Sequence, residues 1–122
     1  MSPKPRTGAI YKGWREGGEA CVAKVLADGR TRGLNLMLHE CNHSPSGAEW
    51  GYNGSGPAHL AFAICFDATR SLRRTWGIYQ RVKERLVSGL PREGWEITRK
   101  KALAVIQAIE KDLDERERRK PV

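Results

Sequence analysis

The fold is decided by the stretch GSGPAHLAFAICF, residues 54–66. Proline is favourable in the first turn of a helix, where its missing N–H would have no partner, and Ser55 or Gly56 can serve as the N-cap. From 58 to 66 every residue except His59 is small or apolar. Because a helix that is apolar on all sides must be buried on all sides, this stretch predicts a central core helix.

The residues before this helix predict an antiparallel meander of three strands, at 9–14, 19–27 and 32–39. Gly17-Gly18 provides the first turn, and Asp28-Gly29 is typical of a type I′ hairpin turn with positive φ at both central residues. In the third segment every second residue from Leu34 to Leu38 is leucine, so these side chains share one face.

The residues after the core helix predict a helix over 74–88, a short strand at 95–97 and a last helix capped by Thr98. The element order is therefore β-β-β-α-α-β-α. It describes an α+β fold in which a small antiparallel sheet of three or four strands packs on about three helices. We expect one domain over 1–122, with flexible ends at 1–8 and 115–122.

Composition places the chain among soluble globular proteins, with 39% hydrophobic and 30% charged residues in 122. The longest apolar run, 60–66, is far shorter than the roughly 20 residues of a membrane span. The three cysteines form no CxxC pair and are expected to be reduced. We therefore expect a cytoplasmic protein without a membrane partner.

Positive charge is concentrated in one block of the sequence. The net charge is +8, and ten basic residues against three acidic ones lie between Arg70 and Lys101, whereas residues 41–69 contain no Lys or Arg. Such a block favours polyanionic partners, namely nucleic acid or the phosphates of a nucleotide. A solvated surface that keeps the protein soluble is the alternative.

The glycine-rich loop before the core helix is the first candidate site. A helix N-terminus attracts anions, glycines let a ligand approach the backbone, and aromatic rings can stack on a base. No lysine follows the glycines, so the loop is not a P-loop. The alternative is a tight corner with Trp50 and Tyr52 packed as core. The predicted ligand-binding residues are Trp50, Gly51, Tyr52, Gly54, Ser55, Gly56, His59, Arg70, Arg73 and Arg74.

A metal site and a catalytic site are disfavoured by spacing. His39, Cys41 and His43 would share one face of a strand, and Cys65 could complete a tetrahedron, but zinc sites usually show CxxC or HxxxH spacing. There is no Gly-x-Ser-x-Gly elbow, and His59 near Ser55 is not by itself a dyad. The sequence therefore favours a protein without metal, cofactor or enzymatic activity.

The segment SPSGAEWGYNGSGPAHLAFAICFD, together with YQRVKERLVSGLP and GWEIT, resembles a family of small uncharacterised domains encoded mainly by bacteria, phages and other mobile elements. Its hallmark is W-G-Y-x-G-S-G-P-A, which Trp50 to Ala58 match. The resemblance implies a fold and a genomic setting, but no activity. Where the family commonly has Gln, this chain has His59.

These observations favour a non-catalytic binding protein for an anionic, nucleotide-like ligand, in the role of a phage or mobile-element accessory or counter-defence protein. A second hypothesis is nucleic-acid binding through the 70–101 block, a third is inhibition of a host protein, and homo-oligomerisation is left open. The residues of the second hypothesis are Arg81, Arg85, Lys100 and Lys101.

Overall fold

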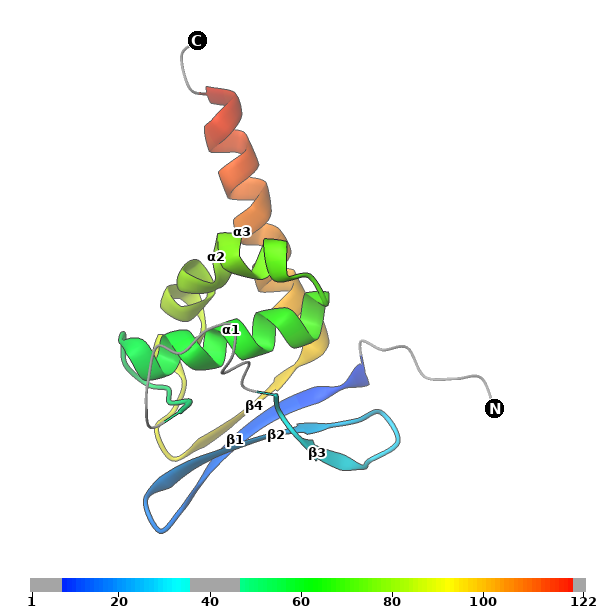
Figure 1. Ribbon diagram of the computed structural model, residues 1–122, viewed down its shortest axis with the longest axis vertical. Helices are drawn as coiled ribbons and strands as arrows, with labels where there is room; N and C mark the ends of the chain where they lie inside the picture. The colour runs from blue at the N-terminus through cyan, green and yellow to red at the C-terminus, as the bar shows by residue number, and fades with distance from the viewer. Residues whose placement is uncertain (1–7, 36–46, 120–122) are drawn as a thin grey trace.

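The computed structural model describes residues 8–35 and 47–119 and shows a sheet with helices on one of its faces (Figure 1). This confirms the predicted α+β class and element order. The elements are β1 (Ile10–Glu16), β2 (Glu19–Val25), β3 (Thr31–Gly33), α1 (Ser55–Thr69), α2 (Leu72–Arg85), the 3₁₀ turn η2 (Val87–Gly89), β4 (Gly94–Thr98) and α3 (Arg99–Arg119).

The four strands are antiparallel neighbours in the order β3-β2-β1-β4, so the last strand pairs with the first. Gly13 of β1 lies opposite Trp95 of β4. A Cβ atom on Gly13 would lie 2.4 Å from the Trp95 indole, so only glycine allows this ring to lie flat on β1.

The two hairpin turns differ in type. Gly17 and Gly18 both have positive φ, as expected for a two-residue type I′ turn. In the second hairpin only Gly29 has positive φ, and the Leu26 N–H donates to the Arg30 carbonyl across a three-residue loop. The predicted type I′ turn at Asp28-Gly29 is therefore wrong, because a type I turn followed by a left-handed glycine closes this loop. The rest of the predicted third strand, 36–39, lies outside the described residues.

Helix α1 is the centre of the core, as predicted. Its residues from Gly56 to Cys65 are all buried, because the sheet covers one side and α2 and α3 cover the other (Figure 1). The N-cap is Gly54 rather than Ser55 or Gly56, the two predicted positions, and the helix continues to Thr69.

Helices α2 and α3 cross above α1 (Figure 1). Ser71 caps α2 by accepting a hydrogen bond from the Arg74 N–H at 3.2 Å, and the helix ends at Arg85 rather than at residue 88. Helix α3 continues through Arg119, into the segment 115–122 for which the sequence predicts flexibility. None of the described helices has the length and apolar character needed to cross a membrane.

Candidate functional site

Trp50 of the glycine loop lies in the core at the β1–β2 turn end of the sheet. Its side chain is fully buried, its indole Nε1 donates to the Arg92 carbonyl at 3.0 Å, and its ring meets Trp95 edge to face at 5.6 Å. The Arg15 guanidinium lies 4.5 Å from the centre of the same ring. Trp50 thus has protein partners on its edge and its face.

Arg15 ties this loop to the sheet. Its two terminal nitrogens donate to the two carboxylate oxygens of Glu49 at 2.8 Å each, and its Nε donates to the Arg92 carbonyl. The hydrogen bonds from Arg15 hold the pKa of Glu49 below its usual value. The loop is therefore fixed by a bidentate ion pair with little exposed surface.

The glycines of the loop allow close packing at the N-terminus of α1. A Cβ atom on Gly54 would lie 2.7 Å from the Tyr52 ring, and one on Gly56 would lie 2.6 Å from the Cβ atom of Glu49. Gly51 has a φ of 86°. The side chains of Tyr52 and Glu49 therefore exclude a Cβ atom at Gly54 and Gly56, so packing is sufficient to explain glycine at these two positions, although Tyr52 itself is 47% exposed.

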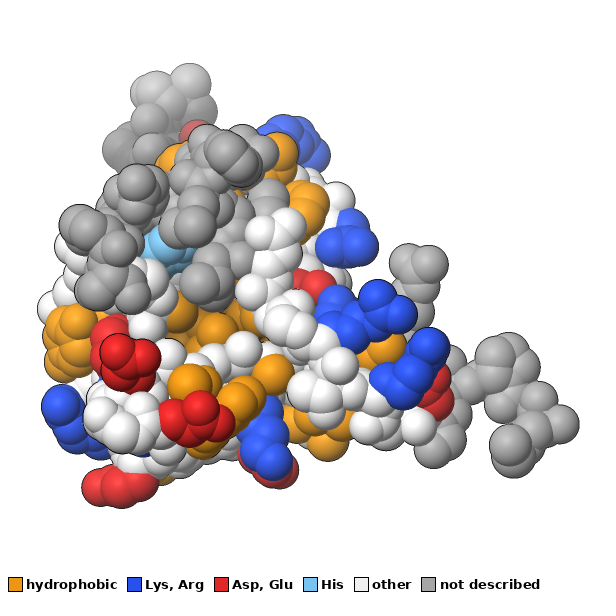
Figure 2. Space-filling view, turned by 60° about the horizontal axis from the view of Figure 1, so that its bottom comes forward, with side chains coloured by type: hydrophobic (Ala, Val, Ile, Leu, Met, Phe, Trp, Pro, Cys, Tyr) orange, Lys and Arg blue, Asp and Glu red, His pale blue; other side chains and the backbone are white. Residues whose placement is uncertain are grey.

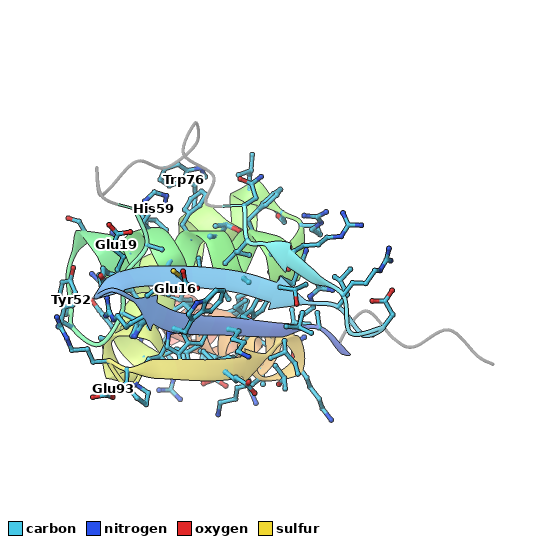
Figure 3. All side chains as sticks on the ribbon, turned by 90° about the horizontal axis from the view of Figure 1, so that it is seen from below. Glu16, Glu19, Tyr52, His59, Trp76 and Glu93 are labelled. Atoms are coloured by element: carbon cyan, nitrogen blue, oxygen red, sulfur yellow. The ribbon has the colours of Figure 1, made fainter. Side chains whose placement is uncertain are left out.

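The charge at this end of the sheet is unfavourable for an anion. Figure 3 shows Glu16, Glu19 and Glu93 at the same end as Tyr52, and all three glutamates are exposed. Ser55 is exposed at the start of α1, while His59 is fully buried within it.

The structure divides the predicted ligand-binding residues into two groups. Those from Trp50 to His59 gather at the N-terminal end of α1, while Arg70, Arg73 and Arg74 lie beyond its C-terminal end. The two groups are separated by the length of α1, about 21 Å at 1.5 Å per residue. One small ligand cannot span both, so the phosphate-neutralising arginines belong to a different surface.

A buried ionic centre around Asp67 marks the C-terminal end of α1. The Asp67 carboxylate accepts hydrogen bonds from Tyr11 Oη at 2.8 Å, Lys24 Nζ at 2.6 Å and Arg99 Nη2 at 2.8 Å. Burial opposes ionisation of Asp67, but these hydrogen bonds outweigh it and hold its pKa below the usual value. Burial also raises the pKa of Tyr11. The centre joins β1, β2, α1 and α3, and sequence reasoning missed it because its members are far apart in the chain.

Positive charge is in excess around this centre. Arg70 places a third cation 3.9 Å from Asp67, with 65% of its side chain exposed, and Arg32 lies opposite Lys24 in the sheet register. Figure 2 shows Lys and Arg side chains gathered on one side of the molecule. We call Lys24, Arg32, Arg70 and Arg99 the cationic end. Lys24 and Arg99 are paired with Asp67, so the exposed Arg32 and Arg70 are the side chains that suit a negatively charged partner.

Arg70 also has an uncommon backbone conformation. It caps α1 with φ 57° and ψ 28°, and it is the one described residue other than glycine with positive φ. Glycine is the usual residue at this position, because a Cβ atom is strained there. The Asp67 carboxylate already receives three shorter hydrogen bonds, so the fold does not require a cation at position 70.

Replacing Arg70 with glycine should therefore raise the free energy of unfolding by about 0.5–1 kcal/mol, because strain is relieved. Arg73→Gly is the matched control: it removes the same charge from an ordinary position in α2 and should lower stability by up to about 1 kcal/mol. Urea denaturation measures both. Equal destabilisation by the two changes would contradict the strain argument.

The outward face of α2 presents a tryptophan between arginines. Trp76 is 50% exposed, and its ring is held edge to face by Phe62 at 4.8 Å and Tyr79 at 5.6 Å. Its position in the helix layer is labelled in Figure 3. We call the exposed residues Arg73, Trp76, Gly77, Gln80 and Arg81 the α2 face. Helical spacing sets Trp76 apart from the buried Ile78 and Val82.

The remaining predicted residues have varied surroundings. Arg74 makes a bidentate ion pair with Glu110 at 2.9 and 2.7 Å, and Arg85 pairs with Asp112 at 2.8 Å. Lys100 and Lys101 are exposed in the first turn of α3. Of the metal ligands considered from the sequence, His39, Cys41 and His43 lie outside the described residues and only Cys65 lies within them. It is buried, and burial raises the pKa of its thiol.

Comparison with known proteins gives one match. A family of unknown function, DUF6166, matches residues 11–108, which include β2, β3, α1, α2 and β4, most of β1 and the first half of α3. No curated protein and no solved structure matches the chain. The family covers most of the chain, and its description names no substrate or partner.

Proposed function

We propose that this chain, which belongs to the DUF6166 family of unknown function, binds single-stranded nucleic acid across the α2 face and the cationic end. The observation that carries this proposal is the half-exposed ring of Trp76. Folding normally buries tryptophan, and proteins that bind single strands use exposed aromatic rings held in place as stacking platforms. Phe62 and Tyr79 hold the Trp76 ring without covering its outer surface.

The cations around this ring suit a phosphate backbone. Arg73 precedes Trp76 by three residues and so lies beside it on the helix surface, while Arg81 follows Gly77 by four and lies beside that glycine. Arg70 lies just before α2, with most of its side chain exposed. A single strand could stack one base on Trp76 while these guanidinium groups contact successive phosphates.

The proposal keeps the predicted anionic ligand and moves its site away from the glycine loop. Arg70 and Arg73 of the predicted ligand set remain, and Arg81 of the nucleic-acid alternative joins them. The phage or mobile-element setting implied by the motif would suit an accessory protein that coats or sequesters nucleic acid. A cytoplasmic location, homo-oligomerisation and a host-protein target stay predictions.

The test is fluorescence anisotropy with a labelled oligonucleotide. Trp76→Ala should weaken binding by about 1–3 kcal/mol, roughly 5- to 140-fold, because one stacked base is lost. Trp14→Ala is the control, since Trp14 lies on β1 with its Nε1 bonded to Glu16, and it should leave affinity unchanged. No binding by the native protein, or equal losses in the two variants, would overturn the proposal.

The salt dependence of oligonucleotide affinity is a second test of the proposed function. With about three phosphates neutralised by Arg70, Arg73 and Arg81, affinity for a single strand should fall about 20-fold between 50 and 200 mM salt. A mononucleotide should bind much more weakly than the oligonucleotide. Equal affinity for both would instead favour the small nucleotide ligand that the sequence suggests.

A further inference from the structure

A shallow depression lies where α2 crosses α3, next to the α2 face. Its volume is about 290 Å³, close to the lower limit of small-ligand pockets. It combines cationic, acidic and apolar side chains with one glycine. The lining residues are Arg73, Arg74, Gly77, Ile78, Glu110 and Leu113.

Packing does not explain glycine at position 77. It lies in the middle of α2, where glycine is a poorer helix former than alanine, and its φ is not positive. A Cβ atom on Gly77 would have no other atom within 4 Å, so no neighbouring group excludes a side chain. This contrasts with Gly13, Gly54 and Gly56, whose neighbours leave no room. A side chain at position 77 would instead occupy part of the depression.

The lining of the depression suits a nucleobase. Ile78 and Leu113 offer apolar surface, and the exposed Arg73 guanidinium can stack on a planar ring. The Glu110 carboxylate is fixed by its two hydrogen bonds from Arg74, which hold its pKa below the usual value. A carboxylate has acceptor capacity beyond two bonds, and it can accept from an exocyclic amino group such as that of cytosine.

We infer that the depression beside Gly77 receives one unpaired base with an exocyclic amino group, next to a base stacked on Trp76. This inference rests on the proposed binding of single-stranded nucleic acid. The inference restricts the ligand to single strands that contain bases other than thymine. A base held in a duplex cannot enter the depression, and thymine offers no exocyclic amino group.

Gly77→Ala and Gly77→Leu test the inference, with Gly89→Ala as the matched control. Gly89 also has no atom within 4 Å of an added Cβ and lies outside the depression. Gly77→Ala should raise the melting temperature by about 3–5 °C, because alanine favours the helix. Both variants at position 77 should weaken binding of oligo(dC) at least about fivefold, with the larger loss for leucine. Gly89→Ala should leave affinity unchanged.

The native protein should also bind oligo(dC) more tightly than oligo(dT), and a single strand more tightly than the corresponding duplex. Unchanged oligo(dC) affinity in both variants at position 77 would overturn the inference while leaving the proposed function standing. Equal affinity of the native protein for oligo(dC) and oligo(dT) would overturn the amino-group assignment. Absence of binding to any oligonucleotide would overturn the proposed function itself, and the inference with it.

Discussion

Replacing Asp67 with alanine should lower the free energy of unfolding by about 3–5 kcal/mol. The change leaves the partly buried cations Lys24 and Arg99 without their carboxylate, and an uncompensated charge with little access to water is costly. Tyr11 also loses its acceptor. Because the centre joins the central helix α1 and helix α3 to strands β1 and β2, the whole domain should be affected. Urea denaturation followed by tryptophan fluorescence measures the loss.

Asp114→Ala is the matched control for this change. Asp114 pairs with Arg118 at 3.1 Å on the exposed part of α3, where a salt bridge contributes little to stability. The control should change the free energy of unfolding by less than about 0.5 kcal/mol. Similar losses in the two variants would show that Asp67 is not a structural centre.

The ionic centre around Asp67 should also make the free energy of unfolding depend on pH. The pKa of Asp67 is lower in the folded chain than its unfolded value of about 3.9, so the folded state favours the ionised form. Its contribution is therefore complete above the unfolded pKa and is lost as the pH falls through the folded pKa. In Asp67→Asn the decline of stability from pH 5 to pH 2 should be shallower. Glu49 and Glu110, whose pKa values are also lowered, should keep part of the decline.

Trp50→Ala should be the second large loss, about 3–5 kcal/mol. The variant creates a cavity beneath Arg15 and removes the edge-to-face contact with Trp95 and the hydrogen bond to the Arg92 carbonyl. Thermal unfolding measures the loss, and Trp14→Ala, with its partly exposed ring, should lose much less.

This variant also separates the two interpretations of the glycine loop. A stacking residue for a ligand would leave stability nearly unchanged when truncated and would abolish ligand binding. A core residue would do the reverse. Near-native stability of Trp50→Ala would therefore contradict the packing described here and restore the loop as a ligand site.

The elements could be predicted because their signals are local. Alternating apolar residues, paired glycines in turns and the apolar run of 58–66 specify strands, hairpins and a buried helix within a few residues of each other. Boundaries were less accurate: α1 continues past the predicted end to Thr69, and Gly29 closes a three-residue loop. A residue or two at an element's end depends on contacts with distant parts of the chain.

The candidate surface was predicted only in part. The 70–101 block contains Arg70, Arg73 and Arg81 of the proposed surface but not Lys24 or Arg32, and a sequence does not show which arginines are neutralised. Arg74 and Arg85 are paired with acids 36 and 27 residues away, whereas Arg73 and Arg81 are exposed on α2. The outward position of Trp76 depends on how α2 lies across α1, and neither helix encodes that arrangement alone.

The sequence by itself therefore determined the class of fold, the buried character of α1 and the concentration of basic residues. These follow from residue type and spacing along one segment. Only the tertiary structure decided that Trp50 is core, that Asp67 joins four elements, and that Trp76 and Gly77 face outward. Each of these depends on contacts between residues that are far apart in the sequence. Such contacts are determined by tertiary packing rather than by the local sequence pattern.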